Sequence, residues 1–426
     1  MARSPVAAFV VAVLACVSAC NKDNPYYCKG APEDNCIRID GAGPPCSDDG
    51  DCAAPFGICD DDEKKCVQCN ASNAEACGGE APVCREKQCV ACSAHTDCGA
   101  ALACLPSGAC GTDDNVAYVD PNGTDNATCV VGAKCNTIGA ALATNKPYVK
   151  ISGTIDEAVT IDGGRNVTFL AAPGAKLTRS AGSGPVLMVQ GENTTLAVYD
   201  LSISDGPNNV NGLGLVVPPG SASVVELHRV TISGNRGTGI SVGGGALTLT
   251  RSTVSGNVGG GVKVDNAKFV IVGNVIVANG TASTTAGGVS ISTQPDSGNT
   301  LEFNTIHGNA AASPSGTGVH CAAGPSFIAR NNIISDNGSS SNMLQITGSC
   351  AYRYSIVRPG AVPAGMGNLD GDPQFENPAT GDYHIKAGSP AVRAADPETI
   401  FGPFNERDID GHRRTNPADI GADQRP

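Results

Sequence analysis

The sequence predicts an all-β fold, a right-handed parallel β-helix preceded by a small disulfide-rich repeat segment. The main observation is a set of five segments of one form, each ending in Asn. They are Thr231–Asn235, Thr253–Asn257, Val275–Asn279, Thr305–Asn309 and Ile333–Asn337. Successive Asn residues are 22, 22, 30 and 28 residues apart, and short β-branched runs alternate with Gly-rich corners, as in a solenoid. None of these segments has helical periodicity, so the coils are expected to consist of strands.

Composition and charge restrict the functions that this chain can have. Its 426 residues include no Trp, and aromatic residues make up only 4%. A sugar-binding groove built on aromatic stacking is therefore poorly supported. The formal net charge of −13 argues against a nucleic-acid partner and against electrostatic docking on anionic membranes.

The first 19 residues have the form of a secretory signal peptide. An apolar run from Val6 to Val17 is too short to span a bilayer as a permanent helix. It leads into Val-Ser-Ala-Cys20, which resembles a bacterial lipobox; the Cys16 site can be read the same way. Cleavage before Cys20 removes Cys16 and uses Cys20 for lipid, which leaves 18 of the 20 Cys, an even number for pairing. Cys20 is therefore the predicted lipidation site, and ordinary secretion is the alternative.

Residues 20–112 form a predicted cysteine-rich spacer that holds the rest of the chain off the membrane. Between residues 28 and 110 there are 14 Cys, and Cys46, Cys69 and Cys92 recur every 23 residues. So little apolar material requires disulfide staples, although the sequence does not specify their connectivity. A zinc ribbon on Cys66, Cys69, Cys89 and Cys92 is the alternative, disfavoured by the oxidising compartment and the intervening Cys.

Two acidic runs in this segment could hold calcium. They are Asp48–Asp51 and Asp60–Glu63, and neither has EF-hand spacing. Solvated loops are the favoured interpretation, so no cofactor or metal is predicted.

The β-helix is predicted for residues 113–390, with a short helix over Thr137–Ala143 and a longer loop over 208–220. In the helix, Ile138, Ala141 and Leu142 share one face. The stretch from Tyr118 to Ala143 resembles the start of many bacterial β-helix proteins, which implies that the helix caps the first coil.

The aligned repeats predict which side chains point inward. Aliphatic residues three positions before each Asn form one inward ladder: Ile232, Val254, Ile276, Ile306 and Ile334. In the second strand of each coil, another set of aliphatic residues is expected to point inward: Ile240, Val262, Val289 and Val319. The flanking Thr and Ser positions are expected to face outward, since side chains alternate along a strand.

The recurrent Asn residues have a structural interpretation. Asn tolerates left-handed corners, and its amide can bond to the equivalent Asn one coil on, about 4.8 Å away. We expect this ladder at Asn235, Asn257, Asn279, Asn309 and Asn337, with a second one at Asn274, Asn304 and Asn332.

Two disulfides are predicted within the β-helix. Cys321 falls at an inward position, and Cys350 lies 29 residues on, which is one coil's length. Cys129 and Cys135 are six residues apart and are expected to pair.

The only outward constellation of chemical groups on the second strand is Lys263, Asp265 and His320. Lys263 and Asp265 share a face at i, i+2, but His320 lies two coils away, about 10 Å, which is wide for a proton relay. Lys263 or Arg251 could act as the base of a polysaccharide lyase. His307, the His228–Arg229 pair and the turn with Asp370 and Asp372 are interpreted as ordinary surface.

The C-terminal end carries a specific resemblance. The segments Gly367–Phe375, Asp382–Ala391 and Asp408–Gln424 resemble the ends of bacterial surface β-helix proteins of the choice-of-anchor Q type, within the pectate-lyase-like β-helix superfamily. Arg393 and Ala395 depart from the Asp and Gly that the family usually places there. The resemblance implies a C-terminal cap and tail over residues 391–426, seated on the last coil. The cysteine-rich segment resembles repeats of surface lipoproteins from myxobacteria-like organisms.

The leading functional hypothesis is a non-enzymatic surface lipoprotein with a role in adhesion, surface structure or polymer recognition. Its expected location is the outer membrane or cell surface of a Gram-negative bacterium, reached through the lipid on Cys20. An extracellular polysaccharide or cell-surface polymer is the expected partner. The alternative is a polysaccharide lyase or glycoside hydrolase on the outward face, although the predicted strands carry no paired carboxylates of the kind that hydrolases use.

Overall fold

The computed structural model describes residues 43, 45–99, 102–210, 212–285, 287–293, 296, 298–312, 317–322, 327–338 and 344–425, without the side chains of 206–210. It divides into two compact units, Met1–Gly111 and Thr112–Pro426, each considered by itself. The predicted signal peptide and Cys20 lie outside the described residues. Among the residues that are described, no helix has the length and apolar character needed to cross a membrane.

The described part of the first unit consists of small modules stapled by crossed disulfides. Within each described group of four Cys, the first pairs with the third and the second with the fourth. The pairs are Cys46–Cys59 and Cys52–Cys66, Cys69–Cys84 and Cys77–Cys89, and Cys92–Cys104 and Cys98–Cys110. All four Cys of the zinc-ribbon alternative are therefore used in disulfides.

Each module also contains a short antiparallel hairpin. The hairpins are β1 (Ile58–Asp60) with β2 (Lys65–Val67), β3 (Val83–Arg85) with β4 (Gln88–Val90), and β5 (Ala103–Cys104) with β6 (Cys110–Gly111). The short 3₁₀ helices are η2 (Asp49–Asp51), η3 (Ala74–Ala76) and η4 (His95–Cys98). Each hairpin places two Cys opposite each other, and each of these bonds to a Cys that precedes the hairpin, with Cα–Cα separations of 5.3 to 5.8 Å.

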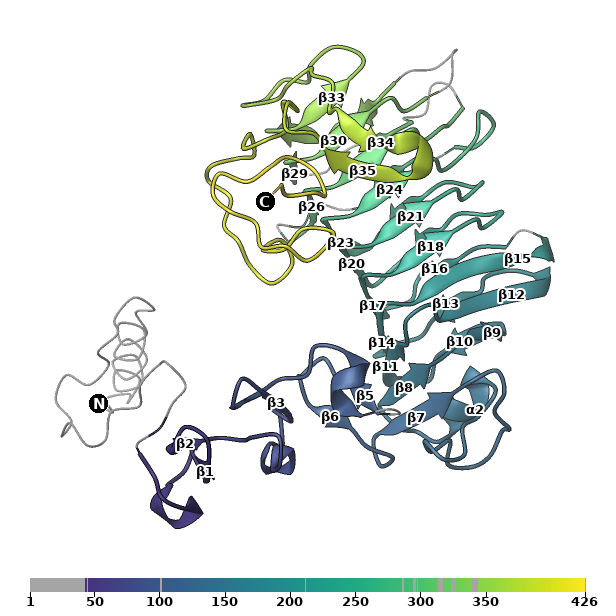
Figure 1. The fold of residues 1–426 in the computed structure, drawn as a ribbon. Helices are drawn as coiled ribbons and strands as arrows, with labels where there is room; N and C mark the ends of the chain where they lie inside the picture. Colours follow the sequence, from purple (N-terminus) through teal and green to yellow (C-terminus); the bar gives the residue numbers. More distant parts are fainter. Residues whose placement is uncertain are drawn as a thin grey trace, which may run out of the picture. The chain divides into compact units, whose positions relative to one another are not determined.

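The second unit is a parallel β-helix, and its described residues form three long parallel sheets (Figure 1). The ten-stranded sheet contains β7 (Val116–Val119), β8 (Tyr148–Ile151), β11 (Asn166–Ala171), β14 (Thr195–Tyr199), β17 (Val224–His228), β20 (Ala246–Thr250), β23 (Lys268–Val272), β26 (Thr300–Glu302), β29 (Ile328–Arg330) and β32 (Ala351–Arg353). The nine-stranded sheet contains β9 (Thr154–Asp156), β12 (Lys176–Ser183), β15 (Ser202–Val210), β18 (Thr231–Ser233), β21 (Thr253–Ser255), β24 (Val275–Val277), β27 (Thr305–His307), β30 (Ile333–Ser335) and β33 (Ile356–Arg358). The eight-stranded sheet contains β10 (Val159–Ile161), β13 (Leu187–Val189), β16 (Leu215–Val217), β19 (Ile240–Val242), β22 (Val262–Asp265), β25 (Val289–Ser292), β28 (Val319–Cys321) and β31 (Ile346–Gly348).

The expected loop over 208–220 is wrong in its extent. β15 continues to Val210, and β16 occupies Leu215–Val217. The reason is that the neighbouring strand β12 is also long. The pairing of β12 with β15 continues past a register shift, where Ala181 pairs with Asn208, and this extends the sheet. Such a shift is a β-bulge-like irregularity, which propensity alone does not reveal.

The inward ladders fill the lumen of the β-helix. Ile232, Val254, Ile276, Ile306 and Ile334 pair in register through successive strands of the nine-stranded sheet, and each has no exposed surface. The second inward set, beginning at Ile240 and ending at Val319, is at most 1% exposed. Burying an aliphatic side chain contributes roughly 1.5–3 kcal/mol, so each of these stacks stabilises the coils that it joins.

Two buried Asn ladders hold the corners. Along the first, each Asn side chain donates from Nδ2 to Oδ1 of the next, at 2.7 to 2.9 Å. The second runs from Asn274 through Asn304 to Asn332 with 3.0 Å bonds. The left-handed residue is the one before each Asn of the first ladder, with φ between 51° and 70° at positions 234, 256, 278, 308 and 336. The Asn itself therefore supplies the hydrogen bonds, while its neighbour, most often Gly, makes the turn.

A short helix covers the first coil. α2 (Ile138–Ala143) buries Ile138, Ala141 and Leu142 in the same core as the lumen. Thr137 caps its N-terminus by accepting a hydrogen bond from the Ala140 N–H, and Glu157 accepts from the first two helical N–H groups at 2.6 and 2.9 Å. The structure also joins Cys129 to Cys135 nearby, and Cys321 to Cys350 farther along the solenoid.

The C-terminal segment lies along the side of the coils, over the nine-stranded sheet and its corner with the ten-stranded sheet (Figure 1). It contains the hairpin of β34 (Phe375–Asn377) and β35 (Asp382–Ile385), with η5 (Pro378–Thr380) between them. Its apolar residues pack on Phe303, Ile333 and Ile356 in a second core outside the lumen. Thr305, expected to face the solvent, points outward but is only 1% exposed and accepts a hydrogen bond from Ala422.

The lateral position differs from the expected cap on the last coil. Gly421 passes so close to the coils that a Cβ there would lie 2.6 Å from Ile333. Buried polar contacts fix the same region: Glu302 bonds Arg330 at 2.9 Å and accepts from Asn331 and Asn405. The C-terminal segment therefore packs as an integral part of the β-helix domain.

Candidate functional site

The sequence-predicted residues lie on the outer face of the eight-stranded sheet. Lys263 and Asp265, both in β22, form an ion pair with 2.7 Å between Nζ and Oδ2. His320 in β28 lies two coils away, since Lys263 pairs with Ser290 and Ser290 with His320. The His320 ring bonds to the Thr347 hydroxyl through Nδ1 at 2.9 Å. The structure thus brings Lys263 and Asp265 together but leaves His320 apart from them.

The other residues singled out from the sequence have structural contacts. Arg251 donates from Nε to the carbonyl of Asp408, which attaches the C-terminal segment to the corner of the coil. His228 stacks on Tyr199 with 4.8 Å between ring centroids, and Arg229 donates to both carboxylate oxygens of Asp200. These contacts hold neighbouring coils and segments together.

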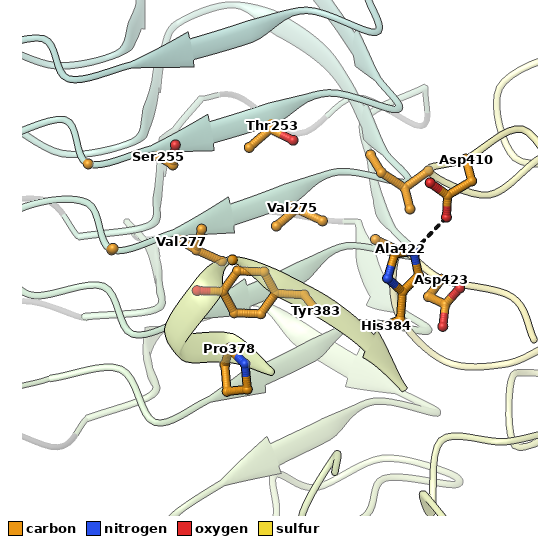
Figure 2. Close-up of a pocket in the computed structure, with 14 residues that line it drawn as sticks. Thr253, Ser255, Val275, Val277, Pro378, Tyr383, His384, Asp410, Ala422 and Asp423 are labelled. Atoms are coloured by element: carbon orange, nitrogen blue, oxygen red, sulfur yellow. Dashed lines mark hydrogen bonds and ion pairs between the residues drawn. The ribbon is translucent and has the colours of Figure 1, made fainter. Parts of the chain in front are cut away.

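A pocket that the sequence reasoning missed lies between the C-terminal segment and the coils (Figure 2). Its volume is about 460 Å³. The lining residues come from β21 and β24 on one side, and from the β34–β35 hairpin, residues 409–410 and residues 422–423 on the other. They are Thr253, Ser255, Gly256, Val275, Val277, Ala278, Pro378, Gly381, Tyr383, His384, Ile409, Asp410, Ala422 and Asp423.

One side of this pocket is apolar. Val275 and Val277 point outward from β24 and are 8% and 4% exposed, because Ala422, Tyr383 and Ile409 pack around them. At the equivalent positions one coil earlier, the chain has Thr253 and Ser255. This change from polar to apolar outward residues is the sequence signal that could have located a covered face.

The opposite rim of the pocket is charged. The His384 ring lies between two carboxylates: Nδ1 is 2.6 Å from Oδ1 of Asp382, and Nε2 is 2.7 Å from Oδ2 of Asp410. Figure 2 shows the contact with Asp410 and places Asp423 beside the ring. Burial lowers the pKa of His384, but the hydrogen bonds to Asp410 and Asp382 outweigh it and raise that pKa to about 9.

The carboxylate of Asp423 is held in place more firmly than the other two. Asp423 is only 7% exposed, and its Oδ2 accepts a hydrogen bond from the Ile385 N–H at 2.9 Å. Burial raises the pKa of Asp423, while the Ile385 hydrogen bond opposes that shift. The backbone just before it is fixed by the buried guanidinium of Arg414, which donates to the carbonyls of Gly421 and Ala422.

Arg414 is itself fixed by packing. Its guanidinium carbon lies 4.2 Å from the centroid of the Phe303 ring, and it is only 4% exposed. Burial lowers the pKa of Arg414 to about 10, although carboxylates including Asp408 and Asp423 act in the opposite direction. Arg414 therefore connects the rim of the pocket to the coil beneath it.

Several groups of side chains could hold a metal ion by proximity alone. In the described residues, His384, Asp410 and Asp423 each offer a ligand atom within 4.8 Å of the others, as do Asp408, Asp410 and His412. The remaining groups consist of Cys residues of the first unit, all of which are in disulfides. Mixed nitrogen and oxygen donors suit a divalent cation.

Comparison with known proteins gives a family match for the solenoid. A model of the right handed beta helix region matches residues 189–358. The second unit contains a right-handed parallel β-helix. No curated protein matches the chain.

Solved structures resemble the chain only distantly. The crystal structure of pectate lyase Pel9A is 15% identical with a TM-score of 0.47, covering 73% of this chain and 96% of that one. A pectin methylesterase from Aspergillus niger is 15% identical with a TM-score of 0.38, covering 61% of this chain and 86% of that one.

Proposed function

We propose that this chain is a lipid-anchored extracytoplasmic protein whose β-helix binds an elongated, polyhydroxylated polymer without cleaving it. The observation that carries the proposal is a row of polar side chains on the outer face of the eight-stranded sheet. The row has one residue per coil: Ser241, Lys263, Ser290, His320 and Thr347.

The register of the coils makes this row regular. Neighbouring parallel strands lie about 4.8 Å apart, so five successive positions extend over roughly 19 Å. Ser290 is 7% exposed, and the other four are more accessible. A linear polymer with repeating hydroxyl groups can form hydrogen bonds with several positions of such a row at once.

The contacts in the row favour binding over catalysis. The Lys263 ammonium is engaged by Asp265, whereas a lyase base must be free to accept a proton from the substrate. Asp265 pairs in register with Ser292, so the next coil offers a hydroxyl at the place where a hydrolase would need a second carboxylate. His320 is bonded to Thr347 and lies two coils from Lys263.

The anchoring part of the proposal rests on the N-terminal sequence. A lipid on Cys20 would attach the chain to the outer membrane or cell surface of a Gram-negative bacterium, and the disulfide-stapled modules would act as the spacer. Three described modules with the same crossed connectivity suit this role, since disulfides stabilise small domains that lack a large core.

The test incubates the full-length chain with a panel of uronic-acid polymers and neutral glycans, and measures both retention and new chain ends. We expect retention of at least one polymer, with no new unsaturated or reducing ends. Lys263→Ala should weaken retention at least tenfold, because a hydrogen bond to a charged group is worth roughly 1.5–3 kcal/mol and about 1.4 kcal/mol is tenfold in affinity.

Lys268→Ala provides the matched control. Lys268 belongs to the same coil and is also paired, with Asp296 at 3.0 Å, but it lies in the ten-stranded sheet. The Lys268→Ala variant should bind the polymer as strongly as the unmodified chain does. New chain ends that disappear in Lys263→Ala or Asp265→Ala would refute the non-catalytic proposal.

A further inference from the structure

We propose that His384, Asp410 and Asp423 form a binding site for a divalent transition-metal cation of the Zn²⁺ type. The site lies at the rim of the pocket between the C-terminal segment and the coils, called here the C-terminal pocket. The three residues come from β35, from the turn after Asp408, and from the end of the chain. Their potential ligand atoms lie within 4.8 Å of one another.

The distances suit such an ion after small side-chain movements. Metal bonds of about 2.0–2.1 Å in a tetrahedral site place ligand atoms roughly 3.3 Å apart. His384 Nε2 and Asp410 Oδ2 are 2.7 Å apart, so the cation would displace the proton between them to solvent, and the two atoms would separate slightly. Both side chains are more than 40% exposed, so their rotamers can adjust, while the buried Asp423 stays fixed.

A second observation, independent of the cluster, is the orientation of the His384 ring. Oδ1 of Asp382 lies 2.6 Å from Nδ1 of His384, so Asp382 fixes the ring with Nε2 directed toward Asp410. Metal-binding His residues usually donate their other ring nitrogen to a carboxylate in this way. Asp382 is therefore a positioning residue for the proposed ligand.

A third observation concerns the unused capacity of the carboxylates. Oδ2 of Asp423 accepts from the Ile385 N–H, but no residue of the described chain donates a hydrogen bond to its Oδ1. Asp410 uses one oxygen, toward His384. Three carboxylates with one imidazole leave an excess of negative charge, which a bound cation would neutralise.

The neighbouring group of Asp408, Asp410 and His412 is a poorer site. Oδ1 of Asp408 accepts from the N–H groups of Asp410 and His412 at 3.1 and 2.7 Å. Its Oδ2 accepts from the Gln424 N–H and lies 3.3 Å from Nδ1 of His412. Asp408 thus already has the hydrogen bonds of a structural carboxylate that shapes the turn.

The ligand set determines the class of cation. Imidazole suits Zn²⁺ and other first-row transition metals, whereas Ca²⁺ prefers six to eight oxygen ligands. Three protein ligands leave a tetrahedral ion one open position. Because all three residues line the C-terminal pocket, we expect that position to face the cavity.

The test uses the full-length chain without a polyhistidine tag, purified in detergent and stripped of metal with a chelator. Titration calorimetry with Zn²⁺ should show one site per chain, and Ca²⁺ should bind at least tenfold more weakly. His384→Gln should weaken Zn²⁺ binding at least 100-fold. Asp382→Asn should weaken it 10- to 100-fold, since second-shell changes typically have that effect.

His412→Gln is the matched control, because His412 lies on the adjacent turn and is not a proposed ligand. It should bind Zn²⁺ with unchanged affinity, and circular dichroism should show that every variant is folded. A chain that binds no Zn²⁺ at micromolar concentration overturns the proposal. So does undiminished binding by His384→Gln, or a loss of binding in His412→Gln alone.

Discussion

At the scale of single residues, the side chain of a buried ladder Asn both accepts and donates hydrogen bonds to groups of neighbouring coils. Asn279 accepts from both the N–H and the side chain of Asn257, and it donates to Asn309 and to the carbonyl of Val254. One side chain therefore satisfies groups in the two coils on either side of its own. A buried polar group that loses its partner costs about 1–3 kcal/mol, so the ladder works as a connected unit.

Asn279→Ala should consequently destabilise the β-helix by about 3 kcal/mol, because groups in both neighbouring coils lose a partner at once. Asn235→Ala is the matched comparison. Oδ1 of Asn235 has no partner among the described residues, since this Asn ends the ladder. Thermal unfolding of both variants should show the larger loss for Asn279, and equal losses would contradict the ladder interpretation.

The residue patterns that could be predicted from the sequence were those that follow from the repeat length of the coils. The Asn ladder and the Cys321–Cys350 pair follow from the coil length, because equivalent positions one coil apart are neighbours. His384 could not be recognised in this way, since Asp410 and Asp423 reach it only through the fold of the C-terminal segment. The left-handed residue was also misassigned to Asn, whereas the preceding residue, most often Gly, takes it.

At the scale of elements, the β34–β35 hairpin is attached to the coils through His307 of β27. The His307 ring packs edge-on against Phe375, with 5.2 Å between centroids, and lies 5.5 Å from Tyr383. Its Nδ1 bonds to the Ser335 hydroxyl at 3.0 Å. Burial lowers the pKa of His307, although Asp336, 3.8 Å away, and the more distant Asp372 raise it.

This environment predicts a loss of stability in mild acid. The folded chain holds His307 neutral below the ordinary imidazole pKa of 6.5, so the unfolded chain binds more protons there. The contribution of His307 is present above pH 6.5 and is lost as the pH falls through its lower folded value. Melting temperatures at pH 7.5 and 5.5, measured with chelator present, should differ less in His307→Gln.

His412→Gln should retain the full pH difference, because His412 is largely exposed. An unchanged difference in His307→Gln would show that burial of this ring does not control the acid response.

The short strands could be predicted from the sequence, but the position of the C-terminal segment could not. Strands recur within one coil, so the repeat itself reveals them. The segment is held by contacts across large sequence separations, such as Arg251 with Asp408 and Thr305 with Ala422. The outward residues Val275, Val277, Ile333 and Ile356 were the available signal that something covers this face.

At the scale of the whole molecule, the two units are stabilised by different means. The described residues of the first unit rely on crossed disulfides, because few of them are apolar and buried. The second relies on a continuous lumen core extended by a lateral segment. The period of 23 residues indicated the repeat from the sequence, but the pairing within each module depends on how its hairpin folds.

The arrangement proposed for the whole molecule makes a test of its anchor possible. If Cys20 carries the lipid, Cys20→Ser should abolish incorporation of a labelled fatty acid, because the thiol is the attachment point. The protein should then leave the membrane fraction, because the proposed attachment is the lipid on that thiol. Cys16→Ser is the matched control: it alters the alternative lipobox and should leave labelling intact. Labelling that depends on Cys16 would reassign the anchor and leave Cys20 as an additional thiol in the spacer, whereas labelling that survives both changes would contradict lipidation at either Cys.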